Sequence, residues 1–184
     1  MVNIGIVGAT GYVGIEIIRI LQNHPEVNIS MVVSQSFAGR KISDVYPSLR
    51  NVFDMECQEL DLDKVAECSD IVITALPHGV SNQVVPEFLK RGKRVIDTSG
   101  DFRYKSVEMY EKWYKTKHSA PELLKEAVYG LPELHRDEIK GTAIVANPGC
   151  YPTCSILGLA PLLSNGLVDT NDIIINAVSG VTGA

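Results

Sequence analysis

The sequence predicts an α/β fold built on a doubly wound parallel sheet. Three observations lead to this class. Short apolar, β-branched runs recur along the chain. Amphipathic stretches of helical length separate them, which is the pattern of βαβ units with helices on both faces of the sheet. A glycine-rich turn joins the first run to the first amphipathic stretch.

The elements of the first third are bounded by clear stop signals. Residues 2–7 form an apolar run that ends at Gly8, which predicts the first strand. Residues 12–23 place Val13, Ile17 and Leu21 on one side and precede Pro25, which predicts a helix. Residues 27–33 predict the second strand.

The rest of the chain continues the alternation. Residues 70–76 predict a buried strand that stops at Pro77, and residues 80–90 a helix that stops at Gly92. Further strands are predicted at 94–97, 142–146 and 172–178, and helices at 107–115 and from near Tyr151 through 157–163. The intervals 37–53 and 120–141 are predicted to be joints between these elements.

Composition excludes several classes of protein. The 184 residues suffice for one domain plus part of another, and 45% hydrophobic with 21% charged residues allow a packed core. A net charge of −5 without a basic stripe argues against nucleic-acid binding. No apolar run reaches about 18 residues, so no membrane span is expected. No basic and apolar leader is present, so no signal peptide is expected.

The four cysteines are too few for a disulfide scaffold and lack zinc-type pairing with histidines. The sequence therefore predicts free thiols, no metal site and a reducing, cytoplasmic location.

The turn after the first strand has the spacing G-x-x-G-x-x-G and opens a helix, which is the context of a dinucleotide-binding, Rossmann-like domain. Backbone N–H groups at the helix start would hold a pyrophosphate. The alternative is a tight turn that needs glycine only for its backbone angles. The predicted cofactor-binding residues of this turn are Gly8, Thr10, Gly11, Tyr12, Val13 and Gly14.

The end of the second strand discriminates between NAD and NADP. An NAD site usually has an acidic residue there, whereas this chain has Ser34, with Arg40 and Lys41 close behind. A hydroxyl and two cations suit a 2′-phosphate, so the predicted cofactor is NADP. The alternative is that the two cations are solvated loop charges. Pro77 and His78, after the third strand, are predicted to close over the cofactor, and a simple turn histidine is the alternative.

Cys150 follows a strand and precedes an apolar helix, in the segment Asn147-Pro148-Gly149-Cys150-Tyr151-Pro152-Thr153. Pro152 suits the first helical turn. The positive end of the helix dipole favours a thiolate at Cys150, which suggests covalent acyl chemistry beside a nicotinamide ring. The alternative, an inert buried thiol, is the reading given to Cys57 and Cys68. Cys154, one turn further on, is expected to be a packing residue or a neighbour of the site.

Four segments together resemble the N-acetyl-gamma-glutamyl-phosphate reductases of arginine biosynthesis, which are related to the aspartate-semialdehyde dehydrogenases. They are 8–14, 99–103 (Ser-Gly-Asp-Phe-Arg), 129–134 (Tyr-Gly-Leu-Pro-Glu-Leu) and 147–153. The resemblance implies reduction of an acyl phosphate by NADPH to a semialdehyde and phosphate, with Cys150 as the nucleophile that carries a thioester.

The same resemblance implies further site residues. Arg103 would contact the phosphate of a small-molecule acyl-phosphate substrate, and Asn147 would orient the cysteine loop. A salt bridge from Arg103 to Asp97 or Asp101 is the alternative. Ser99 and Gly180 would lie near the cofactor.

Residues 1–147 would form the NADP-binding domain, and 148–184 the start of a truncated α+β substrate domain. Relatives are nearly twice as long and carry their acid/base histidine in that domain. This chain alone is therefore expected to be inactive, and the full-length protein to be a homo-oligomer. The same chemistry on aspartyl or aminoadipyl phosphate, or a non-catalytic NADP-binding module, remain alternative functions.

Overall fold

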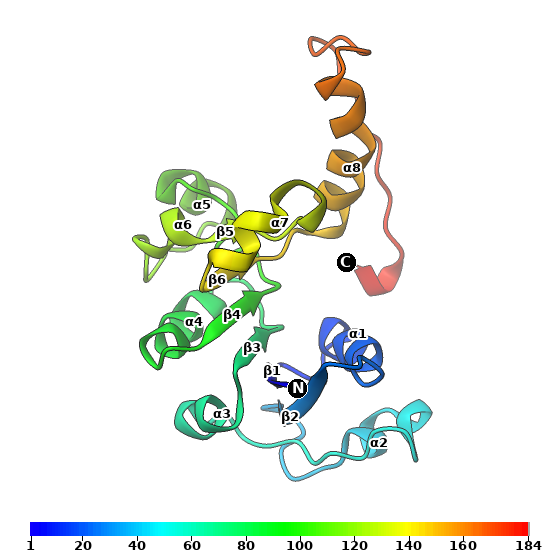
Figure 1. Ribbon diagram of the computed structural model, residues 1–184, viewed down its shortest axis with the longest axis vertical. Coiled ribbons are helices and arrows are strands. Elements are labelled where there is room, and N and C mark those ends of the chain that lie inside the picture. Colours follow the sequence, from blue (N-terminus) through cyan, green and yellow to red (C-terminus); the bar gives the residue numbers. More distant parts are fainter. Residues whose placement is uncertain (184) are drawn as a thin grey trace.

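The computed structural model of the chain describes residues 1–183, and it contains a six-stranded sheet in which all recorded strand pairs are parallel. The strand order is β2-β1-β3-β4-β6-β5 (Figure 1). This confirms the predicted doubly wound α/β class. The strands are β1 Val2–Val7, β2 Val27–Val33, β3 Ile71–Thr74, β4 Arg94–Asp97, β5 Val128–Tyr129 and β6 Ile144–Ala146.

Helices cover both faces of the sheet because side chains alternate between the faces along each strand. Ile6 and Ile73 join a core cluster with Ile18 of α1, whereas Val7 and Val72 join a second cluster with α3, α4 and α6. The helices are α1 Tyr12–Leu21, α2 Ile42–Val45, α3 Leu62–Cys68, α4 Ser81–Lys90, α5 Val107–Tyr114, α6 Leu123–Glu126, α7 Pro132–Gly141 and α8 Cys150–Ser164.

The direction in which successive strands are added to the sheet reverses between β1 and β3. From β1 the chain crosses first to β2 on one side and then to β3 on the other. Connections that leave neighbouring strands in opposite directions open a crevice at the carboxyl ends of those strands, where ligands of such sheets bind. The turn after β1 and the loop after β3 therefore meet at one edge of the sheet.

The interval 172–178, predicted to be a strand, is not one. Its backbone pairs with no strand among the described residues, and Ile174 and Val178 are 84% and 95% exposed. An apolar, β-branched run becomes a strand only where a neighbouring strand takes up its hydrogen bonds. In Figure 1 this segment follows α8, which projects away from the sheet.

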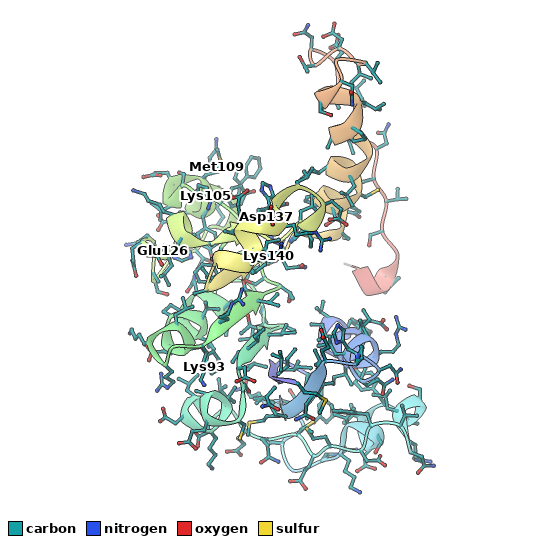
Figure 2. All side chains as sticks on the ribbon, in the orientation of Figure 1. Lys93, Lys105, Met109, Glu126, Asp137 and Lys140 are labelled. Carbon is teal, nitrogen blue, oxygen red and sulfur yellow. The ribbon has the colours of Figure 1, made fainter. Side chains whose placement is uncertain are left out.

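The two intervals predicted to be joints contain regular structure. Residues 37–53 include α2 and a 3₁₀ turn, Pro47–Leu49, and these bury Ile42 and Leu49 against the face that carries α1. Residues 120–141 include α6, β5 and α7. Lys105, labelled in Figure 2, fixes the end of α6 by donating hydrogen bonds to the carbonyls of Lys125 and Ala127.

None of the helices within residues 1–183 combines the length and the apolar character needed to cross a bilayer.

Candidate active site

The three glycines of the first turn are required, or not required, for different structural reasons. Gly8 has φ +90°, and a Cβ there would overlap the carbonyl of Ala75 at the end of β3. A Cβ at Gly14 would overlap the backbone of Gly8 and Ala9. Gly11 has an ordinary φ of −76°, and its Cβ would meet nothing closer than the Gly8 oxygen at 3.5 Å. The turn therefore needs Gly8 and Gly14 for packing, whereas Gly11 keeps a path to the backbone open.

The start of α1 fits a pyrophosphate. Gly11 is the N-cap residue and makes no side-chain capping bond, so the cap position itself leaves the N–H groups of the first turn uncovered. Tyr12 and Val13 are 66% and 51% exposed, which is unusual for residues of their type in a core-facing helix. Uncapped N–H groups at the positive end of a helix dipole form an anion-binding site, and this one opens into the crevice of the sheet.

Ser34 connects the glycine turn to the end of β2. It is buried, and its hydroxyl lies 2.7 Å from Thr10 Oγ1 and accepts the N–H of Phe37 at 3.3 Å. Tyr46 donates to the Thr10 carbonyl, which adds a second bond to this turn. The exposed Arg40 lies with its guanidinium 5.5 Å from the centre of the Phe37 ring. Arg40 is thus positioned by the loop that Ser34 anchors.

The loop after β3 lies directly beside this turn, because the backbone of Ala75 is packed against Gly8. Pro77 and His78 are exposed, and the ring of His78 lies 4.8 Å from that of Tyr114. His78 Nδ1 accepts the N–H of Gly100 at 2.7 Å. The two predicted cofactor-binding residues thus lie in the loop at the carboxyl end of β3, and His78 also contacts the segment 99–103.

Asp101 is the residue of this region that sequence reasoning missed. Its buried carboxylate accepts the N–H groups of Gly79 and Asn82, each at 2.9 Å, and the hydroxyl of Tyr110 at 2.9 Å. It thereby caps α4, whose own N-cap residue Val80 makes no side-chain cap. Burial, together with the hydrogen bond that the Tyr110 hydroxyl donates to Asp101, raises the pKa of Tyr110 to about 12. A cap that lies 20 residues away along the chain has no local sequence signature.

Ser99 lies in a buried polar network with its side chain already bonded. Its hydroxyl donates to Asp97 Oδ2 at 2.6 Å and accepts the Asp101 N–H at 3.1 Å, while Thr74 donates to Asp97 Oδ1 at 2.7 Å. Burial raises the pKa of Asp97, and the hydrogen bonds from Ser99 and Thr74 oppose that shift. The network joins the carboxyl ends of β3 and β4.

Arg103 makes neither of the salt bridges that were considered for it. Its Nε donates to the Asn147 carbonyl and its Nη2 to the Thr98 carbonyl, both at 2.8 Å. Nη1 lies 3.2 Å from the position that a Cβ on Gly149 would take. Since carbonyls do not neutralise a guanidinium, the positive charge of Arg103 is held beside the Asn147–Cys150 turn.

Cys150 is exposed and is the first residue of α8. The helix begins because Thr153 closes its first turn onto the Gly149 carbonyl, through both its N–H (3.0 Å) and its hydroxyl (2.9 Å). Gly149, the N-cap residue, makes no side-chain cap. Asn147 fixes the preceding turn, because its N–H donates to the Asp97 carbonyl at 2.8 Å and its amide to the Pro148 carbonyl at 3.1 Å.

The other cysteines differ in exposure. Cys57 is buried, as predicted, and burial raises its pKa. Cys68 is exposed, so its predicted burial is wrong; it is the last residue of α3 and lies on the solvent side of the helix next to the exposed Glu67. Cys154 is exposed, one turn after Cys150.

At Gly180, a Cβ would meet no heavy atom within 4 Å among the described residues beyond its chain neighbours, so no contact from that position to the other candidate residues is seen. A cavity of about 280 Å³ lies at the opposite end of the sheet, at the amino ends of β4 and β6, where Lys93 and Glu126 line it (Figure 2). The chemistry-bearing residues therefore gather along the carboxyl edge and not in that cavity.

Comparison with known proteins agrees with this geometry. Residues 3–142 match the family described as semialdehyde dehydrogenase, NAD binding domain, and residues 150–184 match its dimerisation domain. N-acetyl-gamma-glutamyl-phosphate reductases of Acetivibrio thermocellus and Desulforudis audaxviator are 65% and 51% identical over all 184 residues. The chain spans 53% of the length of each of these relatives.

Solved structures share the fold at low identity. Aspartate semialdehyde dehydrogenase with NADP from Candida albicans superposes with a TM-score of 0.69 at 20% identity, over 90% of this chain and 47% of that one. Aspartate semialdehyde dehydrogenase II of Vibrio cholerae gives 0.65 at 21% identity, over 89% and 47%. Together with the match over residues 3–142, the glycine turn and the strand order show that this chain belongs to the semialdehyde dehydrogenase family through its NAD binding domain.

Proposed function

We propose that this chain forms the cofactor-binding and nucleophile-bearing part of an N-acetyl-gamma-glutamyl-phosphate reductase of arginine biosynthesis. One observation carries the proposal: an exposed cysteine begins a helix at the carboxyl edge of the sheet, and Arg103, which pairs with no carboxylate within residues 1–183, lies against the same turn. The names of relatives that are 50–65% identical over the chain support this choice of substrate over aspartyl or aminoadipyl phosphate.

The residues divide the work of acyl-phosphate reduction. The Cys150 thiolate attacks the acyl carbon, the bond to the phosphate oxygen breaks, and a thioester to Cys150 remains. Arg103 holds the departing phosphate with its positive charge and the N–H groups that the bonds to the Asn147 and Thr98 carbonyls leave over. The helix dipole of α8 stabilises negative charge on the developing oxyanion. A bound reduced nicotinamide supplies the hydride that converts the thioester to the aldehyde and returns the thiolate.

NADP is the nicotinamide cofactor that we propose. The glycine turn and the uncapped start of α1 would hold its pyrophosphate, and Arg40, an exposed cation on the loop after β2, would bind the 2′-phosphate. Ser34 would act mainly through Thr10 and Phe37, because its hydroxyl is buried between them. A lower dissociation constant for NADPH than for NADH supports this assignment, and equal constants contradict it.

Residues 150–184 match a dimerisation domain, and they expose the apolar side chains of Ile174 and Val178. We propose that the natural protein assembles as a homo-oligomer through this region.

The test is phosphate-dependent reduction of NADP⁺ by the natural full-length protein, with N-acetylglutamate, aspartate and N-acetylated aminoadipate semialdehydes as substrates. We expect the first to give the highest kcat/KM. Substitution Cys150→Ser should reduce the rate by at least about a thousandfold, because a hydroxyl is a far weaker nucleophile at neutral pH.

Cys154→Ser is the matched control, since it changes the same chemical group on the same helix one turn away. It should keep most of the activity. Iodoacetamide should label Cys150 fastest, with protection by the acyl phosphate. Full activity of Cys150→Ser would move the nucleophile elsewhere, and a preference for aspartate semialdehyde would overturn the proposed substrate.

A further inference from the structure

His78 lies between two loops that the proposed function uses separately. It belongs to the loop after β3, on the cofactor side, and its Nδ1 accepts the N–H of Gly100 at 2.7 Å. Because Nδ1 acts as the acceptor, the proton of the neutral ring is on Nε2. The ring is exposed and packs on Tyr114, at 4.8 Å between centroids. One ring nitrogen of His78, Nδ1, is therefore hydrogen-bonded to the backbone of the neighbouring loop.

The Gly100 peptide is part of the turn that fixes Arg103. The Thr98 carbonyl, two residues earlier, accepts Arg103 Nη2 at 2.8 Å, and the Gly100 carbonyl accepts the Arg103 N–H at 3.4 Å. Gly100 has no room for a side chain, because a Cβ there would overlap the Tyr114 ring. The ring of Tyr114 thus packs against both His78 and Gly100, in the same turn whose Thr98 and Gly100 carbonyls accept hydrogen bonds from Arg103.

Two further hydrogen bonds, buried in the protein, connect the same two loops. The buried carboxylate of Asp101 accepts the N–H groups of Gly79 and Asn82. Asp101 fixes the base of the turn, whereas the bond from Gly100 to His78 fixes its outer end. This outer end leads to the Arg103 guanidinium, whose Nη1 lies beside Gly149 and the Cys150 turn.

We propose that His78 is a positioning residue for the phosphate site: by accepting the Gly100 N–H, it keeps the guanidinium of Arg103 in place beside the Cys150 turn. The inference rests on the proposed function, because it assigns phosphate to Arg103. It differs from the role predicted from sequence, in which His78 contacts the cofactor. The two roles use different nitrogens: positioning needs an acceptor at Nδ1, and direct contact uses the N–H at Nε2.

Two substitutions separate the nitrogens. In His78→Asn, the amide oxygen can take the place of Nδ1 and accept the Gly100 N–H. In His78→Gln, the amide lies one bond further out, near the place of Nε2, and the acceptor at Nδ1 is lost. We expect His78→Gln to raise KM for phosphate about fivefold in aldehyde oxidation, the size expected for one lost hydrogen bond, with KM for NADP⁺ unchanged. His78→Asn should keep KM for phosphate within about twofold of wild type.

A double-mutant cycle tests whether the effect passes through Arg103. Arg103→Lys removes the bidentate guanidinium and should itself raise KM for phosphate. If His78 acts by positioning that guanidinium, His78→Gln should add little to Arg103→Lys. Multiplicative effects of the two substitutions on KM for phosphate would overturn the inference, as would a rise in KM for NADP⁺ with no change for phosphate.

Hydrogen exchange of the segment 98–103 gives a readout that does not need activity. Exchange should be faster in His78→Gln than in wild type and should be restored in His78→Asn. Equal exchange and equal KM for phosphate in the two variants, in a wild-type enzyme that is active, would refute the role of His78 alone. A wild type without phosphate-dependent activity would refute the proposed function, whatever the exchange shows.

Discussion

At the scale of single residues, the three glycines of the first turn illustrate how one motif combines fold and function. Gly8 and Gly14 have no space for a Cβ, because backbone atoms of Ala75, Gly8 and Ala9 occupy it. Gly11 does have space. A side chain at Gly11 would therefore disturb what approaches the turn and leave the turn itself intact.

This difference predicts opposite outcomes for two alanine substitutions. Gly8→Ala should lower the free energy of unfolding by about 2–4 kcal/mol, since it combines a positive φ with overlap against a carbonyl. Gly11→Ala should leave stability nearly unchanged and weaken NADPH binding by about tenfold, because its methyl group lies over the helix start. Urea unfolding and NADPH titration by fluorescence measure the two effects. Equal losses of stability would show that Gly11 also serves packing.

At the scale of elements, α4 begins with the help of a residue from another part of the chain. Asp101 accepts hydrogen bonds from Gly79 and Asn82, whereas α3 begins with its own N-cap, Asp61, which accepts from Asp63 and Lys64. Asparagine caps a helix about as well as aspartate does when it is free to turn its amide oxygen inward. At Asp101 both carboxylate oxygens accept, so one position would receive an NH₂ group that faces another donor.

Asp101→Asn should therefore lower the free energy of unfolding by about 2–3 kcal/mol, as expected for charge-assisted bonds lost in a buried site. It should also loosen the start of α4, seen as faster hydrogen exchange over residues 79–84. Asp61→Asn is the control and should leave the urea midpoint close to that of wild type. A loss as large at Asp61 would mean that the charge matters more than the geometry.

The elements also show what the sequence could reveal. Strands rich in apolar, β-branched residues, such as 2–7 and 27–33, were predicted because such short runs, bounded by turn residues, leave a local signature. The start of α8 at Cys150 followed from Pro152 and the preceding strand. β5 was missed because two residues are too few to show a pattern, and α7 because none of its residues is buried. The interval 172–178 has strand-forming residues but no partner strand within residues 1–183, and the sequence of one segment does not show whether a partner strand is present.

At the scale of the whole molecule, the order of the sheet brings the candidate site together. The glycine turn, His78, Arg103 and Cys150 follow β1, β3, β4 and β6, which are consecutive in the sheet. All four strands run in the same direction, so their carboxyl ends meet along one edge. The residues of the candidate site were each proposed from motifs or from the family resemblance, and their roles stay predictions. The carbonyl partners of Arg103 and the bond from Gly100 to His78 depend on this edge and had no signature in the sequence.

The stability of the molecule as a whole should depend on pH through His118. This buried side chain lies between Phe102 and Tyr110; its Nε2 donates to the Asp101 carbonyl, and its Nδ1 accepts the Ala120 N–H. Burial lowers its pKa, which the nearby Asp101, Glu122 and Glu111 oppose. A histidine with a lowered folded-state pKa binds more protons when unfolded. Its contribution is therefore complete above about pH 6.5 and is lost as the pH falls through the folded-state pKa.

We expect wild-type protein to lose more stability between about pH 7.5 and pH 5.5 than His118→Gln does, although the variant should be less stable at the higher pH because it loses packing between two aromatic rings. Urea midpoints at four or five pH values measure the two slopes. Parallel slopes would mean that protonation of His118 is not linked to unfolding. A steeper slope in the variant would reverse the sign of the linkage and place the dominant acid-sensitive group elsewhere in the molecule.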